Sequence, residues 1–496
     1  MGRQTYILKP HIALCSYERV PYAYLEKYHA RPRSMSEQEF RAALLCDGKN
    51  AIDSSPELDR LMERGFIEPC AGNEKALSSW QQHRRIPNRV MPWMGLEITA
   101  RCNYNCIHCF NAADNQRLSA QMSLEQVSTL LDQAKEAGVN AFLLTGGEPL
   151  LHPQFMEIVE AIYARDMFVF EINTNGFFIT RELLDRLAAF GNKPEIKISF
   201  DGLGYHDWMR GQKGAQEIAL SAIELCVRNG FRTRVQTNIN RRNKGSILET
   251  LELLDEMGVS CSRVIPTTPS TRWEMNAAGQ SLEWAEYYEA FLEITAKYAK
   301  GDHNMEVDGW QAAMLYPNRK AFSLKPVRFS KGSFHMDRPC CMQLKGMASI
   351  AADGELYPCL QCSGWFSAHG VSLANVFKEG LHESILSPAY YAIAHATVAD
   401  KIEHQLKYGN ENDVSRAAEG SDLCEEGSYP FEKGAARCAD CPWLKYCGGG
   451  CPALGGLVHQ GDMLMPDFSS CSFFFDGWYK RFMDALSPWE CLSRME

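Results

Sequence analysis

Strand-like and helix-like segments alternate along residues 90–266, and this alternation constrains the fold more than any other feature of the 496-residue chain. Short apolar runs are separated by amphipathic segments such as Ser123–Ala137 and Ile247–Met257, in which apolar residues recur at helical spacing. Such alternation predicts a parallel sheet of the α/β class. Its six strand–helix units fit a partial (β/α)6 barrel, in which the chemistry is expected at the C-terminal ends of the strands. The expected strands are Met94–Thr99, Ala141–Thr145, Phe168–Asn173, Ile196–Phe200, Arg234–Ile239 and Arg263–Pro266.

Composition excludes several kinds of partner. The formal net charge is −10 and the chain has no run of Lys and Arg, so we expect no nucleic-acid partner. No segment approaches roughly 18 consecutive apolar residues, and Met1–Pro10 lacks the apolar stretch of a signal peptide. We therefore expect a cytoplasmic protein without a membrane partner, in which the 19 cysteines serve as metal ligands or packing residues. The isolated cysteines expected to pack are Cys15, Cys46, Cys70, Cys226 and Cys491.

Three cysteines, Cys102, Cys106 and Cys109, follow the first expected strand directly. Three thiolates on one loop can hold three irons of a [4Fe–4S] cluster and leave the fourth iron without a protein ligand. Zinc is the alternative, but zinc takes four ligands and usually a local CxxC pair. The C-x3-C-x2-C spacing resembles the radical S-adenosylmethionine (SAM) superfamily. This resemblance implies that SAM binds the open iron and that one electron cleaves it to a 5′-deoxyadenosyl radical.

Gly146, Gly147 and Glu148 end the second expected strand. Paired glycines let the backbone approach a ligand closely, and a carboxylate suits an ammonium group. An ordinary turn is the alternative. The segment looks like the GGE motif of the radical SAM family, which holds the amino group of SAM.

Short polar side chains end the third, fourth and fifth expected strands. Turn chemistry is the alternative explanation for Asn-Gly and Asp-Gly pairs at these ends. In similar proteins the corresponding positions line the SAM pocket, which here implies contacts from Asn175, Ser199, Asp201 and Asn238. His108 departs from the family pattern, where an aromatic residue before the third cysteine flanks adenine. No contact is assigned to Arg210.

The C-terminal third is dense in cysteine. It contains Cys341 and Cys359 in a C-x12-G-x4-C arrangement, then C-x2-C-x5-C-x3-C and a final cysteine. This order resembles the SPASM domain, which carries two auxiliary [4Fe–4S] clusters, whereas a pair of zinc sites would not suit the preceding loop. The resemblance assigns Cys438, Cys441, Cys447 and Cys471 to an outer cluster and Cys341, Cys359 and Cys451 to an inner one.

The fourth ligand of the inner cluster stays open in the sequence. Cys340 adjoins Cys341, Cys362 makes a CxxC with Cys359, and an iron left open to substrate is the third alternative. Leu360 stands where sulfatase-maturating relatives have an aspartate, which counts against that activity. The polar stretch Gly409–Gly434 is expected to form a surface lid or loop.

Three domains are expected, at residues 1–88, 89–335 and 336–496. In the first, a capping box at Ser36–Glu39 opens a helix, Pro56–Arg64 forms a second helix and Phe66–Glu68 a short strand. This winged-helix-like pattern loosely resembles the leader-peptide recognition modules of peptide-modifying radical SAM enzymes. A plain helical cap on the barrel is the alternative.

These features predict a radical SAM/SPASM oxidoreductase that modifies a ribosomally synthesised peptide, with a flavodoxin or ferredoxin as electron donor. The expected product carries a thioether or carbon–carbon crosslink. The second hypothesis is the oxidation or epimerisation of a sugar, aminoglycoside or other small metabolite. A non-catalytic iron–sulfur scaffold or sensor is the third, although a sensor needs no SAM pocket. The sequence does not indicate the general base or the C–H bond attacked.

Overall fold

The computed structural model describes residues 3–71, 76–109, 111, 118–268, 270–330, 332–341, 346–408, 438–493 and 495. The expected lid, Gly409–Gly434, lies outside these ranges. Within them, no helix combines the length and apolarity needed to cross a membrane.

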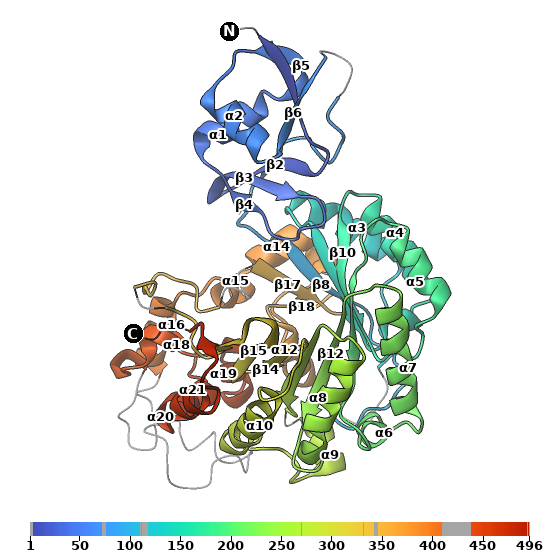
Figure 1. The fold of residues 1–496 in the computed structure, drawn as a ribbon, viewed down its shortest axis with the longest axis vertical. Helices are drawn as coiled ribbons and strands as arrows, with labels where there is room; N and C mark the ends of the chain where they lie inside the picture. Colours follow the sequence, from blue (N-terminus) through green and yellow to red (C-terminus); the bar gives the residue numbers. More distant parts are fainter. Residues whose placement is uncertain are drawn as a thin grey trace.

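A 12-stranded open sheet forms the centre of the molecule (Figure 1). Its middle contains the strands that the sequence predicts, each parallel to the next in chain order, so the α/β partial barrel is confirmed. Their bounds are β8 Trp93–Thr99, β9 Ala141–Gly146, β10 Phe168–Thr174, β11 Glu195–Ser199, β12 Thr233–Ile239 and β13 Cys261–Pro266.

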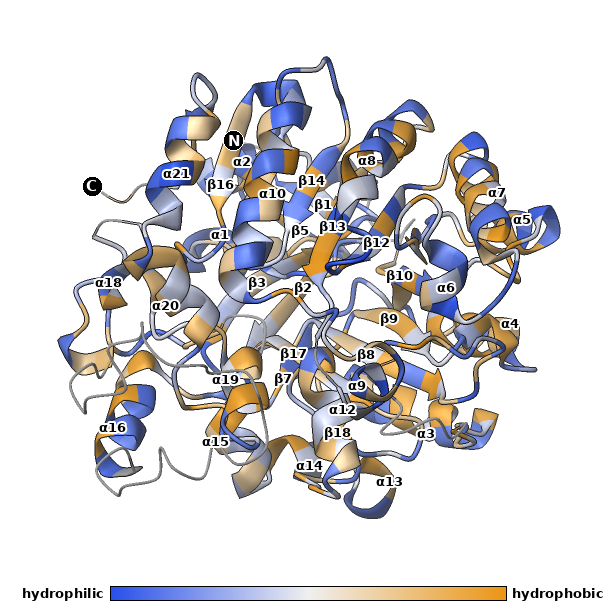
Figure 2. Cartoon of the chain, turned by 90° about the horizontal axis from the view of Figure 1, so that it is seen from below, coloured by the Kyte–Doolittle hydropathy of each residue, from blue (hydrophilic) through white to orange (hydrophobic). Residues whose placement is uncertain are grey.

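Amphipathic helices connect these strands and cover the outer face of the sheet (Figure 1). Helix α3 begins with Ser123, whose side chain accepts from the N–H of Gln126 in a capping box, as the helical pattern predicts. Figure 2 shows hydrophobic and hydrophilic residues alternating along these helices, whose apolar faces pack in one large core with the strands. The helices are α3 Leu124–Glu136, α4 Phe155–Tyr163, α5 Arg181–Ala188, α6 His206–Arg210, α7 Ala215–Arg228 and α8 Ile247–Glu256.

Further strands extend the sheet at both edges, and sequence analysis did not anticipate them. At one edge β17 (Met347–Ile350) pairs in parallel with β8 and continues into β18 (Leu356–Tyr357). The other edge carries β14 Glu306–Gly309, β15 Ala313–Tyr316, β16 Ala321–Leu324 and β19 Glu490–Cys491. Segments from the cysteine-rich region thus pair with both edges, and Cys359 follows β18 directly.

The C-terminal helices share the barrel core. Phe473 of α20 packs against Tyr288 of α10, and Phe482 of α21 packs against Phe291. The helices of this half are α9 Thr271–Ala277, α10 Trp284–Tyr298, α12 Leu360–Ala368, α13 Val376–Glu379, α14 Leu381–Leu386, α15 Pro388–Ala394, α16 Val398–Tyr408, α18 Leu444–Cys447, α19 Pro452–Val458, α20 Phe468–Phe475 and α21 Trp478–Ala485.

Residues 3–88, which we call the N-terminal module, lie above the barrel (Figure 1). Helices α1 (Glu37–Leu44) and α2 (Pro56–Glu63) and strand β6 (Ile67–Cys70) occur where the sequence predicts them, and the Ser36–Glu39 capping box is present. The module also contains strands that sequence analysis missed, arranged in two small sheets ordered β5-β1-β6 and β4-β3-β2-β7. These strands are β1 Gln4–Leu8, β2 Ile12–Tyr17, β3 Val20–Glu26, β4 Arg33–Ser34, β5 Asp47–Ile52 and β7 Arg84–Ile86.

Specific contacts join the module to the N-terminal ends of the barrel strands. The Tyr17 hydroxyl donates to the carbonyl of Gly138 at 3.2 Å, and the Tyr28 hydroxyl donates to that of Phe190 at 3.0 Å. Gly138 follows α3 with a φ of +85°, and a Cβ added there would lie 2.8 Å from the Tyr17 ring and 2.9 Å from Ile86. This junction therefore requires a glycine for both its backbone conformation and its space.

We predict that Gly138→Ala destabilises the chain more than Gly370→Ala. Gly370 follows α12 with a φ of +64°, but nothing lies within 4 Å of its added Cβ. Both substitutions place a side chain in the left-handed region, which costs about 1 kcal/mol, while only Gly138→Ala adds overpacking of about 1–3 kcal/mol. Urea unfolding of the two variants measures the difference. Equal free energies of unfolding would contradict this account of the junction.

Candidate functional site

Gly146 and Gly147 hold the loop that carries Cys102, Cys106 and Cys109. The Gly147 N–H donates to the carbonyl of Thr99 at 2.7 Å, and the Glu148 N–H donates to that of Arg101 at 2.9 Å. A Cβ on Gly146, whose φ is +150°, would lie 2.1 Å from the Thr99 oxygen, and one on Gly147 would lie 2.3 Å from the Arg101 oxygen. The close approach that we expected toward a ligand is therefore made to the chain's own cysteine loop.

Helix α6 holds the same loop from its other side. The Ile107 N–H donates to the carbonyl of Met209 at 3.0 Å. Gly211, with a φ of +57°, lies so close that an added Cβ would be 2.6 Å from the Asn105 oxygen. The cysteine loop is thus fixed by backbone contacts to β9 on one side and to α6 on the other.

Arg210 links this loop to a buried carboxylate, a contact that the sequence did not reveal. Its Nη2 lies 2.7 Å from Oδ2 of Asp201, and its Nη1 donates to Sγ of Cys106 at 3.8 Å. Asp201 is 0% exposed and Arg210 is 7% exposed. Burial opposes both charges, but the pKa of Asp201 is lowered and that of Arg210 raised because their mutual attraction outweighs it. The pair is ionised and places a positive charge beside a cysteine thiol.

Glu148 is fully buried beneath the cysteine loop. Its carboxylate accepts hydrogen bonds of 2.8 Å from the Thr174 hydroxyl and from the Asn175 N–H. Burial outweighs these bonds and raises its pKa to about 7. A cation placed next to this carboxyl would lower its pKa and be attracted in return.

The other expected pocket residues are mostly engaged with the protein. The Asn175 amide donates to Oδ1 of Asn103 at 2.8 Å, which ties the end of β10 to the cysteine loop. The Asn238 amide donates to Oδ1 of Asp201 at 3.2 Å. Ser199 is half-buried, and its hydroxyl makes no hydrogen bond with any residue that the structure describes. The structure thus joins Asn175 and Asn238 to the cysteine loop, links Asp201 to it through Arg210, and leaves the Ser199 hydroxyl available.

His108 is held as a neutral ring. Burial lowers its pKa to about 4, and the side chain is 9% exposed. Its Nδ1 lies 3.2 Å from the Met209 carbonyl, and its Nε2 lies 3.3 Å from Nδ2 of Asn238. In a neutral ring Nδ1 therefore donates to the carbonyl and Nε2 accepts from the amide. These bonds fix the plane of the ring that stands in for the aromatic residue of the family pattern.

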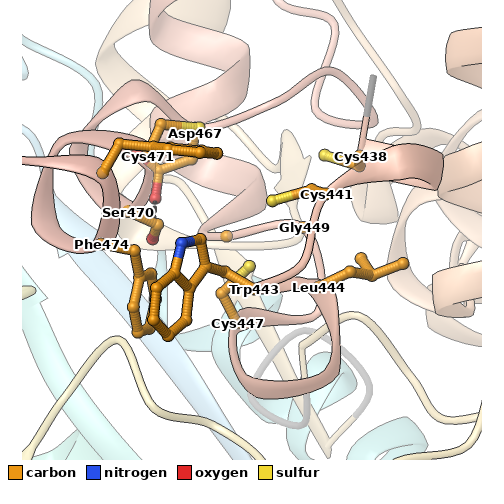
Figure 3. A pocket seen from close by; sticks show the side chains of 12 residues that line it. Cys438, Cys441, Trp443, Leu444, Cys447, Gly449, Asp467, Ser470, Cys471 and Phe474 are labelled. Carbon is orange, nitrogen blue, oxygen red and sulfur yellow. Dashed lines mark hydrogen bonds between the residues drawn. The ribbon is translucent and has the colours of Figure 1, made fainter. Parts of the chain in front are cut away.

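The thiols of Cys438, Cys441, Cys447 and Cys471 line one cavity (Figure 3). Cys438 and Cys441 lie on the side opposite Cys471, and the aromatic rings of Trp443 and Phe474 form part of the wall. Burial raises the pKa of the Cys447 thiol to about 12, so a thiolate there needs a cation for compensation. Four sulfur donors around an apolar cavity suit an iron–sulfur cluster.

Three glycines join this cavity to the next cysteine. Gly448, Gly449 and Gly450 have φ values of +59°, +83° and +77°. A Cβ on Gly448 would lie 2.4 Å from the Phe329 ring, and one on Gly450 would lie 2.6 Å from Asp467. The spacing between Cys447 and Cys451 is therefore made by a tight left-handed segment that only glycine allows.

Cys341, Cys359 and Cys451 gather in a separate small cluster with Tyr357 and Phe366. Burial raises the pKa of Cys359 to about 12, and negative charges on Cys451 and Cys341 raise it further. Arg328 is half-buried, and burial alone would lower its pKa. Negative charges on Cys451 and Cys341 outweigh that effect and raise the pKa of Arg328. The described cysteines are all free thiols, so sulfur donors are available at each of the three sites. These thiols match in kind the sulfur ligands of three [4Fe–4S] clusters.

Comparison with known protein families matches residues 96–254 to the radical SAM superfamily. An AdoMet-dependent heme synthase of Methanosarcina barkeri is 32% identical over 187 residues, which cover 37% of this chain and 52% of that protein. The antilisterial bacteriocin subtilosin biosynthesis protein AlbA of Bacillus subtilis is 29% identical over 164 residues, or 33% of this chain and 36% of AlbA. The chain spans about half or less of the length of these curated relatives.

Among solved structures, the fold is similar to that of Streptococcus suis SuiB bound to the precursor peptide SuiA, with a TM-score of 0.62. The similarity covers 94% of this chain and all of SuiB at 15% identity. At this identity it is a likeness of fold, and it includes the N-terminal module and the cysteine-rich region together with the barrel.

We predict that Arg210→Met strongly destabilises the chain, whereas Arg186→Met does not. Removing Arg210 leaves Asp201 as an unpaired buried charge, which costs about 3–5 kcal/mol. Arg186 pairs with Glu160 at 3.4 Å, but both side chains are half exposed, so that pair contributes at most about 1 kcal/mol. Anaerobic urea unfolding of both variants gives the free energies. Similar losses for the two would show that Arg210 and Asp201 do not form a buried ion pair.

Proposed function

Because this chain belongs to the radical SAM superfamily and has the cysteine-rich C-terminal region of its SPASM members, we propose that it modifies a ribosomally synthesised peptide. The reaction is reductive cleavage of SAM followed by abstraction of hydrogen from a C–H bond, which leads to a crosslink or another oxidation. When bound, the cluster and SAM supply the electron and the hydrogen-abstracting carbon radical. The protein works in the cytoplasm with a flavodoxin or ferredoxin as reductant.

Ten cysteines are proposed as ligands. Cys102, Cys106 and Cys109 hold the cluster that binds SAM, because three thiols leave one iron open. The Arg210 guanidinium lies beside the Cys106 thiol. The seven of the C-terminal region hold two auxiliary clusters, whose chemistry is electron transfer. The proposed ligands are Cys102, Cys106, Cys109, Cys341, Cys359, Cys438, Cys441, Cys447, Cys451 and Cys471.

Residues around the loop are proposed to bind SAM. Glu148 attracts the amino group, because a neighbouring ammonium favours the ionised form of a carboxyl whose pKa is about 7. Ser199 offers its hydroxyl to the ribose or carboxylate, and Gly146 and Gly147 allow the close backbone approach that holds the cysteine loop beside the ligand. The Asn175 amide bonds to the cysteine loop, and the Asn238 amide bonds to Asp201 on the neighbouring strand end. These bonds fix the shape of the pocket.

The proposal of a peptide substrate rests on the N-terminal module. Its three-stranded sheet has two edges, β5 and β6, at which an extended peptide can add as a further strand. The side chains of Phe66 and Ile67, where β6 begins, are buried in the module's own core. Strand β6 also contains Pro69, which has no N–H to donate. Strand β5 has no proline, and residues 49–51 are exposed, so β5 is the proposed docking edge.

Two comparisons support a peptide over a small molecule. SuiB, whose structure contains a precursor peptide, is similar over nearly the whole of this chain, including the module. AlbA takes part in the biosynthesis of a bacteriocin. The heme synthase supports the second candidate, a small-molecule substrate, over a share of this chain similar to that of AlbA, 37% against 33%, so the argument for a peptide rests mainly on SuiB. A small-molecule enzyme gives the open edges of the module no role.

We predict about 12 irons per chain, four for each of three clusters. Replacing Cys102, Cys106 and Cys109 together by alanine is expected to remove about four irons and to abolish formation of 5′-deoxyadenosine from SAM. Iron analysis after anaerobic reconstitution and chromatography of the SAM products test both. The control replaces Cys15, Cys46 and Cys226, which are buried in hydrophobic clusters, and should keep its iron. Formation of 5′-deoxyadenosine by the first variant would refute the proposed reaction.

We predict that a candidate precursor peptide, encoded beside the gene for this chain, slows amide hydrogen exchange in β5. The new strand would pair with the backbone of Asp47–Ile52 and protect its N–H groups. Mass spectrometry of the full chain with and without peptide measures this, and β4 of the other small sheet is the internal reference. Protection restricted to the barrel, or modification of the peptide without any change in the module, would favour a substrate that binds without the module.

A further inference from the structure

The inner cysteine group contains a fourth thiol beyond those of the SPASM pattern. We propose that Cys362 is the fourth protein ligand of the inner cluster, which therefore has no open iron. The proposal rests on the proposed function for the presence of that cluster. It concerns a residue to which the family resemblance assigned no role.

The first turn of helix α12 brings Cys362 next to Cys359. Cys359 is the N-cap residue of α12, and Cys362 lies three positions further on, so both side chains belong to one turn. The Sγ of Cys362 lies 3.0 Å from the carbonyl oxygen of Cys359. At this end of the nine-residue helix the unpaired N–H groups and the dipole favour thiolates.

Cys362 also belongs to the same packed group as the other inner thiols. It is 2% exposed and lies in the hydrophobic cluster that contains Cys341, Cys359 and Cys451. Cys362 is therefore a fourth sulfur atom in the packed group that contains the three proposed ligands.

Cys340 has a different environment. Its N–H donates to the carbonyl of Ala396 at 3.0 Å, and its own carbonyl accepts from Nη1 of Arg328 at 3.2 Å. Cys340 is not a member of the hydrophobic cluster that contains Cys341, Cys359, Cys362 and Cys451. Its neighbours are α16 and the buried amine of Lys401.

Closure of the inner cluster by Cys362 has a functional consequence. A cluster with four protein ligands, one on each iron, offers no coordination position to an incoming peptide group, so the inner cluster can take up or pass on an electron without binding substrate. The open iron at the loop of Cys102, Cys106 and Cys109 is then the position at which an exogenous ligand binds. Substrate recognition falls to the pocket walls and the N-terminal module.

Cyanide, a small ligand for open iron sites, tests the proposal in the full-length chain. The parent for this test carries Cys102→Ala, Cys106→Ala and Cys109→Ala, which removes the SAM-binding cluster and leaves about eight irons. Cys362→Ala and Cys340→Ala are added to it separately as a matched pair. Reduced samples are compared by electron paramagnetic resonance with and without cyanide, and iron is determined for each. Neither SAM nor peptide is present, so a failed peptide assay does not affect the result.

We expect no response to cyanide in the parent or in Cys340→Ala. In Cys362→Ala we expect either a cyanide-dependent change of the spectrum or a loss of iron from the inner cluster. If alanine unfolds the first turn of α12, Cys362→Ser provides the same measurements with a side chain of similar size. A response in the parent, a response in Cys340→Ala alone, or an unchanged Cys362→Ala variant would each overturn the proposal. A parent with only about four irons would remove the inner cluster itself and with it the proposed set of cofactors.

Discussion

The position of the cysteine loop depends on backbone-to-backbone contacts that leave no room for a side chain. Gly147 binds the Thr99 carbonyl on one side, and Gly211 lies against the Asn105 carbonyl on the other. A ligand set of three thiols is useful only if the loop holds them at fixed separations, because a flexible loop would lose much of the binding energy in ordering entropy. The two contacts supply that order from elements of the barrel, and the end of β10 adds a third through Asn175.

Positive charge accompanies each group of thiols. Arg210 donates to Cys106, Arg328 feels the charges of Cys451 and Cys341, and Lys401 acts on Cys438. A buried thiolate is costly on its own, and a neighbouring cation lowers this cost in the same way as it does for a buried carboxylate. The chain thus places a cation beside three sites that would each hold negatively charged sulfur ligands. The buried Asp201 balances Arg210 and keeps that cation oriented.

Much of the fold could be predicted from the sequence because its signals are local. Each barrel strand, the capping box of α1 and the spacing within each cysteine motif is a pattern that spans only a few neighbouring residues. The strands β1–β3 were not predicted, because the winged-helix-like pattern expected for residues 1–88 contained two helices and a single short strand at Phe66–Glu68. The contact between Arg210 and Cys106 joins residues 104 positions apart, and the partners of Glu148 come from another strand. Such pairs follow from the packing of the sheet, which no local pattern specifies.

The pairing of the sheet also determines the order of the cysteine groups in space. Strand β17 lies beside β8, the strand that leads into the cysteine loop, and β18 then delivers Cys359 at the start of α12. The inner group is therefore one hairpin away from the loop, while the outer group is joined to it through Gly448–Gly450. Electron transfer between clusters depends on the distance between them. Strand β17, which is added at the edge of the barrel, is therefore as much a part of the site as the thiols. The sequence contains every proposed ligand, but their succession in space is a property of the sheet.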